Sequence, residues 1–149
     1  MKVVIQRVSE GSVSIPEENY KAKIEKGLVV LLGIKTGDSE KEVTSLADKC
    51  CNLRIFEDEN DKMNLSIKDI DGELLIISQF TLYGDAQKGN RPGFTDAAKP
   101  HEAVPLYEKF IARVKENIGE SKVKTGIFGA MMFVKIFNDG PVTIIIESK

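Results

Sequence analysis

The stretch Leu74-Leu75-Ile76-Ile77-Ser78-Gln79-Phe80-Thr81 decides the fold. Its continuous apolar run is typical of a strand that is buried on both faces, and we expect a central strand over Glu73–Thr81. Gly27–Ile34 is apolar in the same way and predicts a second buried strand. The domain is therefore expected to form around a sheet.

Two amphipathic helices are predicted beside these strands. The first runs over Glu40–Asn52, after Ser39, a residue type that caps helix N-termini. Its apolar residues follow the spacing of one helix face: Val43, Leu46, Ala47 and Cys50. The second helix begins near Pro105, a residue type favoured at helix starts, and ends at Gly119. Its apolar face comprises Leu106, Phe110, Ile111, Val114 and Ile118.

The remaining segments predict shorter strands joined by turns. Gly11 interrupts a β-rich run and predicts a hairpin of Lys2–Val8 with Ser12–Ile15. Further strands are expected over Ala22–Glu25, Leu53–Phe56, Val123–Ile127, Met132–Phe137 and Val142–Glu147. This order predicts an α/β fold, a sheet-dominated single domain over residues 1–149 in which a partly barrel-like sheet packs with two main helices.

Composition narrows the classes of partner and cofactor. The 149 residues carry a formal net charge of -2 and no Trp, so there is no global basic signal and no broad stacking platform for nucleic acid. A local basic patch can still serve an RNA partner. No apolar segment is long enough to span a bilayer, and we expect a cytoplasmic protein that binds neither membrane nor DNA. The adjacent Cys50 and Cys51 and the single His101 supply neither a disulfide nor a zinc site, and no metal or cofactor is expected.

The sequence lacks the residues of common hydrolase machinery. His101 is the only histidine, and no Gly-x-Ser-x-Gly motif is present, so a Ser-His-Asp mechanism is not expected. What remains are polar residues at the end of the central strand: Ser78, Gln79, Thr81 and Tyr83. They indicate either a strand that emerges into solvent or a ligand cradle built from hydroxyl and backbone N–H groups.

A second unusual segment is Asn138-Asp139-Gly140-Pro141-Val142-Thr143. Asn138-Asp139-Gly140 is a hairpin-turn signal, and Pro141 removes a backbone donor where the last strand is expected to begin. One interpretation is a turn with a stiff exit. The other is a cis peptide bond that fixes the direction of two carbonyl groups.

Six segments together resemble the D-aminoacyl-tRNA deacylase family, once called D-Tyr-tRNA deacylases. Besides the two segments above, they are Ile5-Gln6-Arg7-Val8, Gly27-Leu28-Val29-Val30-Leu31-Leu32-Gly33, Asn52-Leu53-Arg54-Ile55-Phe56 with Lys62-Met63-Asn64, and Lys88-Gly89-Asn90-Arg91-Pro92. The resemblance implies a homodimer that hydrolyses the ester joining a D-amino acid to the 3′ end of tRNA. It also implies an editing role in trans that recycles mischarged tRNA.

The resemblance also implies roles for individual residues. Gly140 and Pro141 match a Gly-cisPro motif that reaches into the pocket of the partner subunit and occupies the space of an L side chain. Glycine has no side chain to exclude, so glycyl-tRNA is expected to be accepted to some degree. Ser78, Gln79, Phe80 and Thr81 match the other pocket motif.

Within that pocket motif, backbone N–H groups near Phe80 and Thr81 are expected to hold the substrate carbonyl and stabilise the oxyanion. Thr81 is the tempting nucleophile, but a threonine hydroxyl is weak without a base and the sequence offers none nearby. We therefore expect Thr81 to position the substrate. The ribose 2′-OH of the tRNA is a further candidate to orient or activate water.

Other residues are expected to shape the pocket or to contact tRNA. Phe128 and Met131 should lie near the pocket, where Met131 and Phe133 depart from the polar residues usual in the family. Lys88 and Arg91 lie in the irregular segment between Gly84 and Pro100 and are candidates for contacts with tRNA phosphates. Arg7, in its apolar strand, is a third candidate. The alternative for the two loop residues is that they are simply solvated.

Three other functions remain open from the sequence. A non-catalytic dimer that binds the tRNA end would not deacylate its ligand. A hydrolase of another activated acyl ester would cleave small esters without tRNA. An obligate structural oligomer is the third, but it leaves the polar residues at the strand end without a function.

Overall fold

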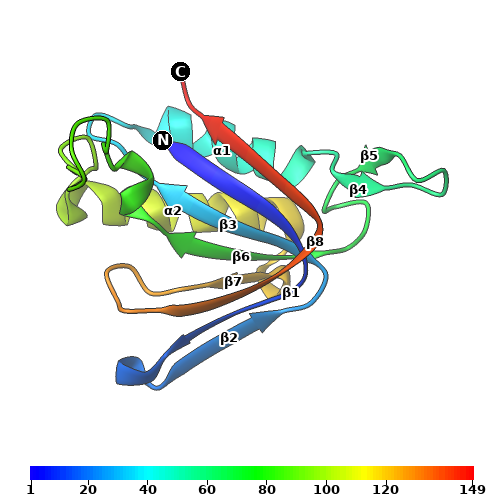
Figure 1. The fold of residues 1–149 in the computed structure, drawn as a ribbon. Helices are drawn as coiled ribbons and strands as arrows, with labels where there is room; N and C mark the ends of the chain where they lie inside the picture. The colour runs from blue at the N-terminus through cyan, green and yellow to red at the C-terminus, as the bar shows by residue number, and fades with distance from the viewer.

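A computed structural model describes residues 1–149 and shows a curved sheet with two α-helices on one face (Figure 1). The strands are β1 (Lys2–Ile15), β2 (Tyr20–Ile24), β3 (Gly27–Gly33), β4 (Phe56–Glu57), β5 (Met63–Leu65), β6 (Glu73–Ser78), β7 (Val123–Thr125) and β8 (Phe133–Glu147). The helices are α1 (Glu40–Asn52) and α2 (Pro100–Ile118), with short 3-10 helices η1 (Pro16–Glu18), η2 (Phe80–Tyr83) and η3 (Glu120–Lys122). No helix is long and apolar enough to cross a membrane.

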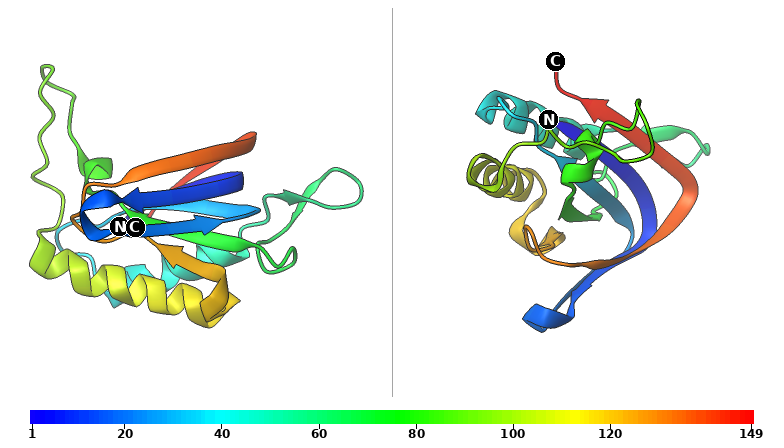
Figure 2. Two further views of the ribbon diagram at one scale, coloured as in Figure 1. Left: turned by 90° about the horizontal axis from the view of Figure 1, so that it is seen from below. Right: turned by 60° about the vertical axis from the view of Figure 1, so that its left-hand side comes forward.

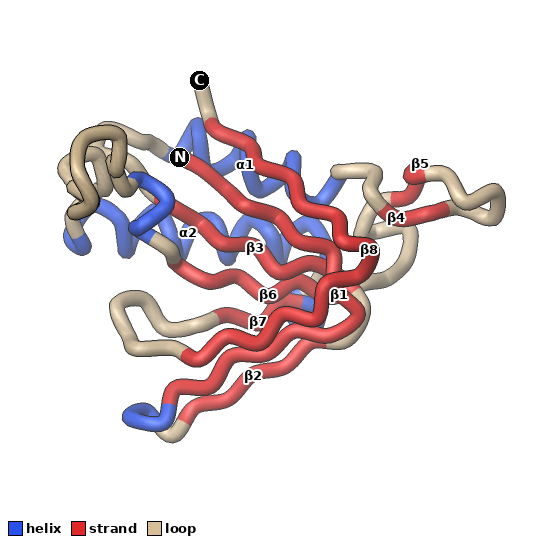
Figure 3. The backbone as a smooth tube through the Cα atoms, viewed as in Figure 1, coloured by secondary structure: helices blue, strands red, loops and turns tan.

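The main sheet has six strands, and β1 is its organising strand. The order is β2-β1-β3-β6-β7, and β8 pairs with β1. The first half of β1 pairs with β3 and β8, whereas its second half pairs with β2 and β8. Register shifts between Gln6 and Glu10 lie where β1 changes partner. Bulges increase local twist and bending, so the long strands curl around the front of β3 and β6 (Figures 1 and 3).

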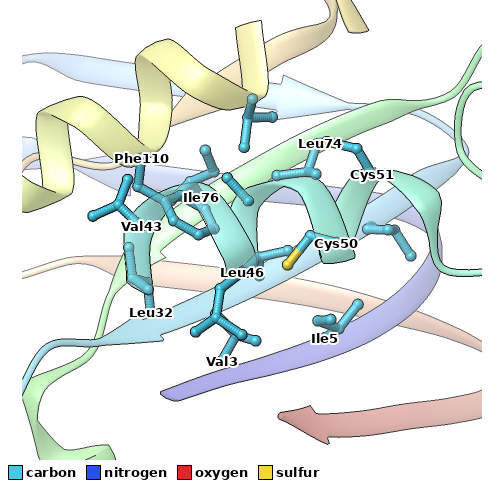
Figure 4. Close-up of a cluster of buried hydrophobic side chains, with 14 of the residues drawn as sticks. Val3, Ile5, Leu32, Val43, Leu46, Cys50, Cys51, Leu74, Ile76 and Phe110 are labelled. Atoms are coloured by element: carbon cyan, nitrogen blue, oxygen red, sulfur yellow. The ribbon is translucent and has the colours of Figure 1, made fainter. Parts of the chain in front are cut away.

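The sheet separates two hydrophobic clusters. The larger one fills the layer between the sheet and the helices, where Val3, Ile5 and Leu32 meet α1 residues such as Leu46, and Phe110 inserts from α2 (Figure 4). The smaller one fills the inside of the curl and comprises Val8, Val13, Ile15, Ile24, Val29, Leu75 and Ile77. Because β3 and β6 contribute to both, they are buried on both faces, as their apolar runs predict. The predicted partly barrel-like sheet with two main helices is confirmed.

Two predicted chain reversals are wrong. Gly11 does not end a hairpin, since β1 runs unbroken from Lys2 to Ile15. A Cβ atom at Gly11 would lie 2.7 Å from Val29 Cγ2, so the glycine permits close packing inside the curl. Asn138-Asp139-Gly140 is not a hairpin turn either, because β8 continues through it as one strand, with a bulge between the pairs Val8–Asn138 and Gln6–Thr143. The predicted strands over 132–137 and 142–147 are therefore parts of β8.

Several predicted boundaries move. The central strand β6 ends at Ser78 rather than Thr81, and the chain then turns into η2. The second helix starts at Pro100, and Pro105 lies inside it. The predicted strand over 53–56 shrinks to the short β4, which pairs with β5, a strand that the sequence did not indicate. Helix α1 has the predicted bounds, and Ser39 and Glu42 form a complete capping box at its start.

Candidate active site

A pocket of about 580 Å³ opens at the end of β6 that carries the polar motif. Its lining residues are Glu17, Ile77, Ser78, Gln79, Phe80, Phe128, Gly129, Ala130, Met131, Met132 and Val134. The pocket therefore joins the end of β6 to the segment that leads into β8. Ser78, Gln79, Phe80, Phe128 and Met131, all predicted from the sequence, lie together in its wall.

Two unpaired backbone donors lie beside this pocket. The Gln79 N–H donates to the Leu32 carbonyl at 2.8 Å and holds the chain to β3. Next, η2 begins, and the first N–H groups of a helix have no acceptor within it. No protein atom accepts a hydrogen bond from the backbone N–H of Phe80 or Thr81. These donors are free to bind an oxygen atom of a ligand.

The Thr81 hydroxyl has no basic partner. Thr81 is exposed and does not line the pocket, and its Oγ1 accepts a hydrogen bond from Gln79 Nε2 at 2.5 Å. An amide donor cannot remove the hydroxyl proton. His101, the only histidine, is exposed at the start of α2 and lies 3.8 Å from Glu102. The structure thus brings no general base to Thr81.

Most of the remaining wall is apolar. The Phe128 ring packs 5.7 Å from the ring of Tyr107, whose hydroxyl donates to the carbonyls of Ile76 and Gly126. Burial raises the pKa of Tyr107, which keeps this hydroxyl protonated. Met131 remains largely exposed at the rim. An apolar wall with few polar groups suits a small organic substituent.

Glu17 was missed from the sequence. It lies in η1 and is the only ionisable residue in the pocket wall. It makes no hydrogen bond or ion pair with another residue. The turn of Pro16–Glu18 is polar and irregular, and only the curl of β1 and β2 brings it to the end of β6. Sequence alone carried no signal for this approach.

Gly140 and Pro141 lie on the exposed side of β8 and away from this pocket. Their peptide bond is cis, and Gly140 has a φ of +126°, a conformation that favours glycine. Asn138 pairs with Val8, which is opposite Gly27 at the start of β3, whereas Ser78 pairs with Leu32. Five residue steps lie between Gly27 and Leu32, so Asn138 and Ser78 are separated by about 16 Å along the direction of β3. Neither Gly140 nor Pro141 lines the pocket of its own chain.

Arg7 supports the backbone just before Gly140. Its side chain is only 5% exposed; Nε donates to the Asp139 carbonyl at 3.0 Å, and Nη1 donates to the Ile55 carbonyl and to Glu57, both at 2.8 Å. The hydrogen bond from Arg7 lowers the pKa of Glu57. A buried arginine held in this way is a structural anchor rather than a phosphate contact.

Lys88 and Arg91 lie in the segment between η2 and α2, which extends away from the body of the domain (Figure 2). Both are exposed, and neither lines the pocket. Neither residue makes an ion pair. Cys50 and Cys51 are buried and unbonded, and burial raises the pKa of both thiols, to about 11 for Cys51. No group of His, Cys, Asp or Glu residues has a metal-binding arrangement.

Comparison with known proteins places this geometry in a family. Residues 4–147 match the family model described as D-Tyr-tRNA(Tyr) deacylase. A D-aminoacyl-tRNA deacylase of Flavobacterium psychrophilum is 54% identical over 149 residues, which cover 100% of this chain and 98% of the relative. A D-aminoacyl-tRNA deacylase of Halalkalibacterium halodurans is also 54% identical and is covered completely, as is this chain.

Solved structures share the fold of this chain. A structure titled c-Myc DNA Unwinding Element Binding Protein superposes with a TM-score of 0.93 at 41% identity, covering 100% of this chain and 99% of that one. A probable eukaryotic D-amino acid tRNA deacylase, at 16% identity and a TM-score of 0.84 over 97% of each chain, shares the fold. Since the family model spans nearly the whole sequence and relatives more than half identical cover its full length, the chain belongs to the D-aminoacyl-tRNA deacylase family.

Proposed function

We propose that this protein hydrolyses the ester bond of D-aminoacyl-tRNA and so removes D-amino acids from mischarged tRNA in the cytoplasm. In the reaction, the oxygen of a water molecule bonds to the ester carbonyl carbon, and the bond from that carbon to the ribose oxygen breaks. The ribose oxygen takes up a proton, and the products are free tRNA and the D-amino acid. No metal or cofactor takes part.

The observation that carries this proposal is the pair of unpaired N–H groups on Phe80 and Thr81 beside the pocket. Attack on the ester converts the carbonyl oxygen into an oxyanion, and preorganised backbone donors stabilise that charge. One such donor is commonly worth about 3 kcal/mol in the transition state. Ser78 and Gln79 complete this wall, and Phe128 and Met131 contact the amino acid side chain.

Water, rather than Thr81, is the proposed nucleophile. The Thr81 hydroxyl accepts a hydrogen bond from Gln79 and has no base to activate it. An aminoacyl ester is already an activated substrate, and the neighbouring 2′-OH of the terminal ribose is placed to orient water or share its proton. In this proposal Thr81 positions the substrate through its backbone N–H and its hydroxyl.

The proposal includes a homodimer in which Gly140 and Pro141 of the partner subunit complete the pocket. Two observations support it: both residues are exposed and do not line their own pocket, and large apolar side chains are exposed on β8 on either side of them. These are Phe137 and Ile145, which are 54% and 66% exposed. Large exposed apolar side chains are typical of a surface that a partner covers.

Gly140 and Pro141 of the partner subunit are proposed to select the D hand by steric exclusion. Their backbone occupies the position of an L side chain, and a D side chain points away from it. Glycyl-tRNA carries no side chain to exclude and is a second proposed substrate. Selectivity therefore rests on shape and needs no additional attraction for the D side chain.

Release of the amino acid from D-tyrosyl-tRNA tests this function. We expect hydrolysis many times faster than the spontaneous rate, and no comparable hydrolysis of a p-nitrophenyl ester of the same amino acid. Binding without hydrolysis would favour a non-catalytic protein that binds the tRNA end. Equal activity on the small ester would favour a hydrolase of another activated acyl ester.

A further inference from the structure

A second hollow lies on the outer face of the sheet, behind the wall of the active-site pocket. It has a volume of about 370 Å³ and is lined by Ser12, Val13, Ser14, Lys21, Ala22, Lys23, Phe133 and Lys135. We call this set the outer groove. It is separate from the candidate active site, and Phe137, assigned above to the proposed dimer interface, lies on the same face of β8 two residues beyond Lys135.

Strand register builds the outer groove from two rows of side chains across the sheet. Ser12 of β1 pairs with Lys23 of β2 on one side and with Lys135 of β8 on the other. Ser14 pairs in the same way with Lys21 and Phe133. Side chains two residues apart point to the same face, so both rows project outward together. The floor is formed by two hydroxyl groups, and the walls by three lysines and a phenylalanine.

The outer groove carries uncompensated positive charge. Lys21 and Lys135 form no ion pair or side-chain hydrogen bond with the protein. Lys23 lies 2.8 Å from Glu10 and 3.4 Å from Glu25, which offset its charge. Lys21 and Lys135 lie on either side of β1, at positions two residues apart along it, and are therefore about 12 Å apart at their backbones. Their long side chains can reach successive phosphates of one nucleic acid strand.

Phe133 gives the outer groove an aromatic surface beside these charges. Its side chain is 62% exposed, and it stands beside Ser14 at the start of β8. An exposed ring next to lysines is the combination that binds single-stranded nucleic acid, because a base stacks on the ring while cations hold the backbone. An apolar protein partner would not match the two free lysines and the two serine hydroxyls.

The outer groove and the active-site pocket are two sides of the same strand. Along β8, Val134 points into the pocket, whereas Phe133 and Lys135 point into the outer groove. Met131 and Met132, which lead into this strand, also line the pocket. An RNA strand that passes around the rim at Met131 can therefore contact both. Along the chain, Met131 at the pocket rim is only two residues from Phe133 in the outer groove.

We propose that the outer groove binds the RNA backbone of the tRNA near its 3′ end, with Lys21 and Lys135 on phosphates and Phe133 stacked on a base. This inference rests on the proposed function, since it presumes that the acylated 3′ end lies in the pocket. It adds a tRNA-binding surface on the opposite face of the sheet from the catalytic groups.

The test compares the double variant Lys21→Gln/Lys135→Gln with Phe133→Ala and with the control Lys49→Gln/Lys62→Gln. The control removes two exposed lysines outside the outer groove. The first readout is the Kd for uncharged tRNA as a function of salt, which does not depend on catalysis. The second is KM for D-tyrosyl-tRNA and for D-tyrosyl-adenosine, which has the ester but no phosphates.

We expect the lysine variant to weaken tRNA binding by about tenfold or more and to reduce the slope of log K against log salt by about 1.4, since each of the two phosphate contacts contributes about 0.7 for a single strand. Phe133→Ala should weaken binding by about tenfold with an unchanged slope, because it removes stacking and no charge. KM for D-tyrosyl-adenosine should not change in either variant, and the control should match the wild type.

Unchanged tRNA binding in the lysine variant overturns the proposal, as does an equal rise in KM for both substrates. Equal competition by duplex DNA of the same charge overturns the assignment to RNA. A shift in oligomeric state of Phe133→Ala on size-exclusion chromatography would assign that ring to subunit assembly instead. If the wild type binds tRNA through the outer groove but does not deacylate it, the proposed function fails and this inference stands.

Discussion

The Nε atom of Arg7 donates a 3.0 Å hydrogen bond to the carbonyl oxygen of Asp139, the residue that precedes Gly140. The same guanidinium also donates to the Ile55 carbonyl and to Glu57. One buried side chain thus fixes β8 to β1 and to the segment before β4 at the point where β8 presents Gly140 and Pro141. The planar fork of arginine reaches several acceptors at once, which lysine cannot do.

Arg7→Lys is therefore expected to destabilise the fold by about 1–3 kcal/mol, because buried acceptors lose their donors. Urea unfolding measures this, and Arg54→Lys serves as a control because Arg54 is exposed and donates to Asn64 alone. Arg7 lowers the folded pKa of Glu57, so their contribution is present above the unfolded pKa near 4.3 and is lost as pH falls below it. Equal stability of wild type and Arg7→Lys at neutral pH would contradict the anchoring role.

Thr81→Ala should retain measurable turnover. The variant keeps the backbone N–H and removes only a hydroxyl that accepts from Gln79. Loss of one hydrogen bond of about 1 kcal/mol corresponds to a decrease in kcat of about fivefold. Single-turnover deacylation of D-tyrosyl-tRNA measures this decrease. A rate at background would show that the hydroxyl is essential and that water is not the direct nucleophile.

Glu17 is expected to attract the α-ammonium group of the substrate, because it is the only ionisable residue in the pocket wall. Glu17→Gln should raise KM by about threefold to fivefold. This factor corresponds to the loss of an exposed ion pair, which contributes less than about 1 kcal/mol. Glu18→Gln is the matched control, since Glu18 is an exposed neighbour that does not line the pocket. With an N-acetylated substrate the difference between wild type and Glu17→Gln should disappear. A difference that persists would exclude this role.

Phe137→Glu should disrupt the proposed dimer. Burial of a phenylalanine at an interface contributes about 2–3 kcal/mol, and a buried charge opposes association further. Sedimentation velocity should show monomers, and deacylation should fall with them because the partner subunit no longer supplies Gly140 and Pro141. Met63→Glu, at an exposed methionine on β5, should remain unaffected. An active Phe137→Glu monomer would refute the cross-subunit site.

The buried elements were predictable because periodicity reports burial. The apolar runs of β3 and β6 predicted strands buried on both faces, and Ser39, a residue type that caps helices, predicted the start of α1. The positions of glycines misled, because Gly11 and Gly140 have tertiary reasons for being glycine. Gly11 leaves space for the Val29 side chain, and Gly140 adopts a positive φ within a continuous strand.

The pocket was predictable only in part. The motif from Ser78 to Phe80 marks the end of β6, and the resemblance to a family placed Phe128 and Met131 near it. Glu17 and the outer groove depend on how β1 and β2 curl, and on cross-strand register between residues more than 100 positions apart, as for Ser12 and Lys135. A single sequence contains no periodic signal for such pairings.

The most direct test of the account is the ratio of kcat/KM for D-tyrosyl-tRNA to that for L-tyrosyl-tRNA, measured with the same enzyme preparation. The two substrates share every atom type and differ only in the hand at one carbon. Steric exclusion by Gly140 and Pro141 of the partner subunit predicts a ratio of at least about 100, which corresponds to about 2.7 kcal/mol. A ratio near one would contradict the account.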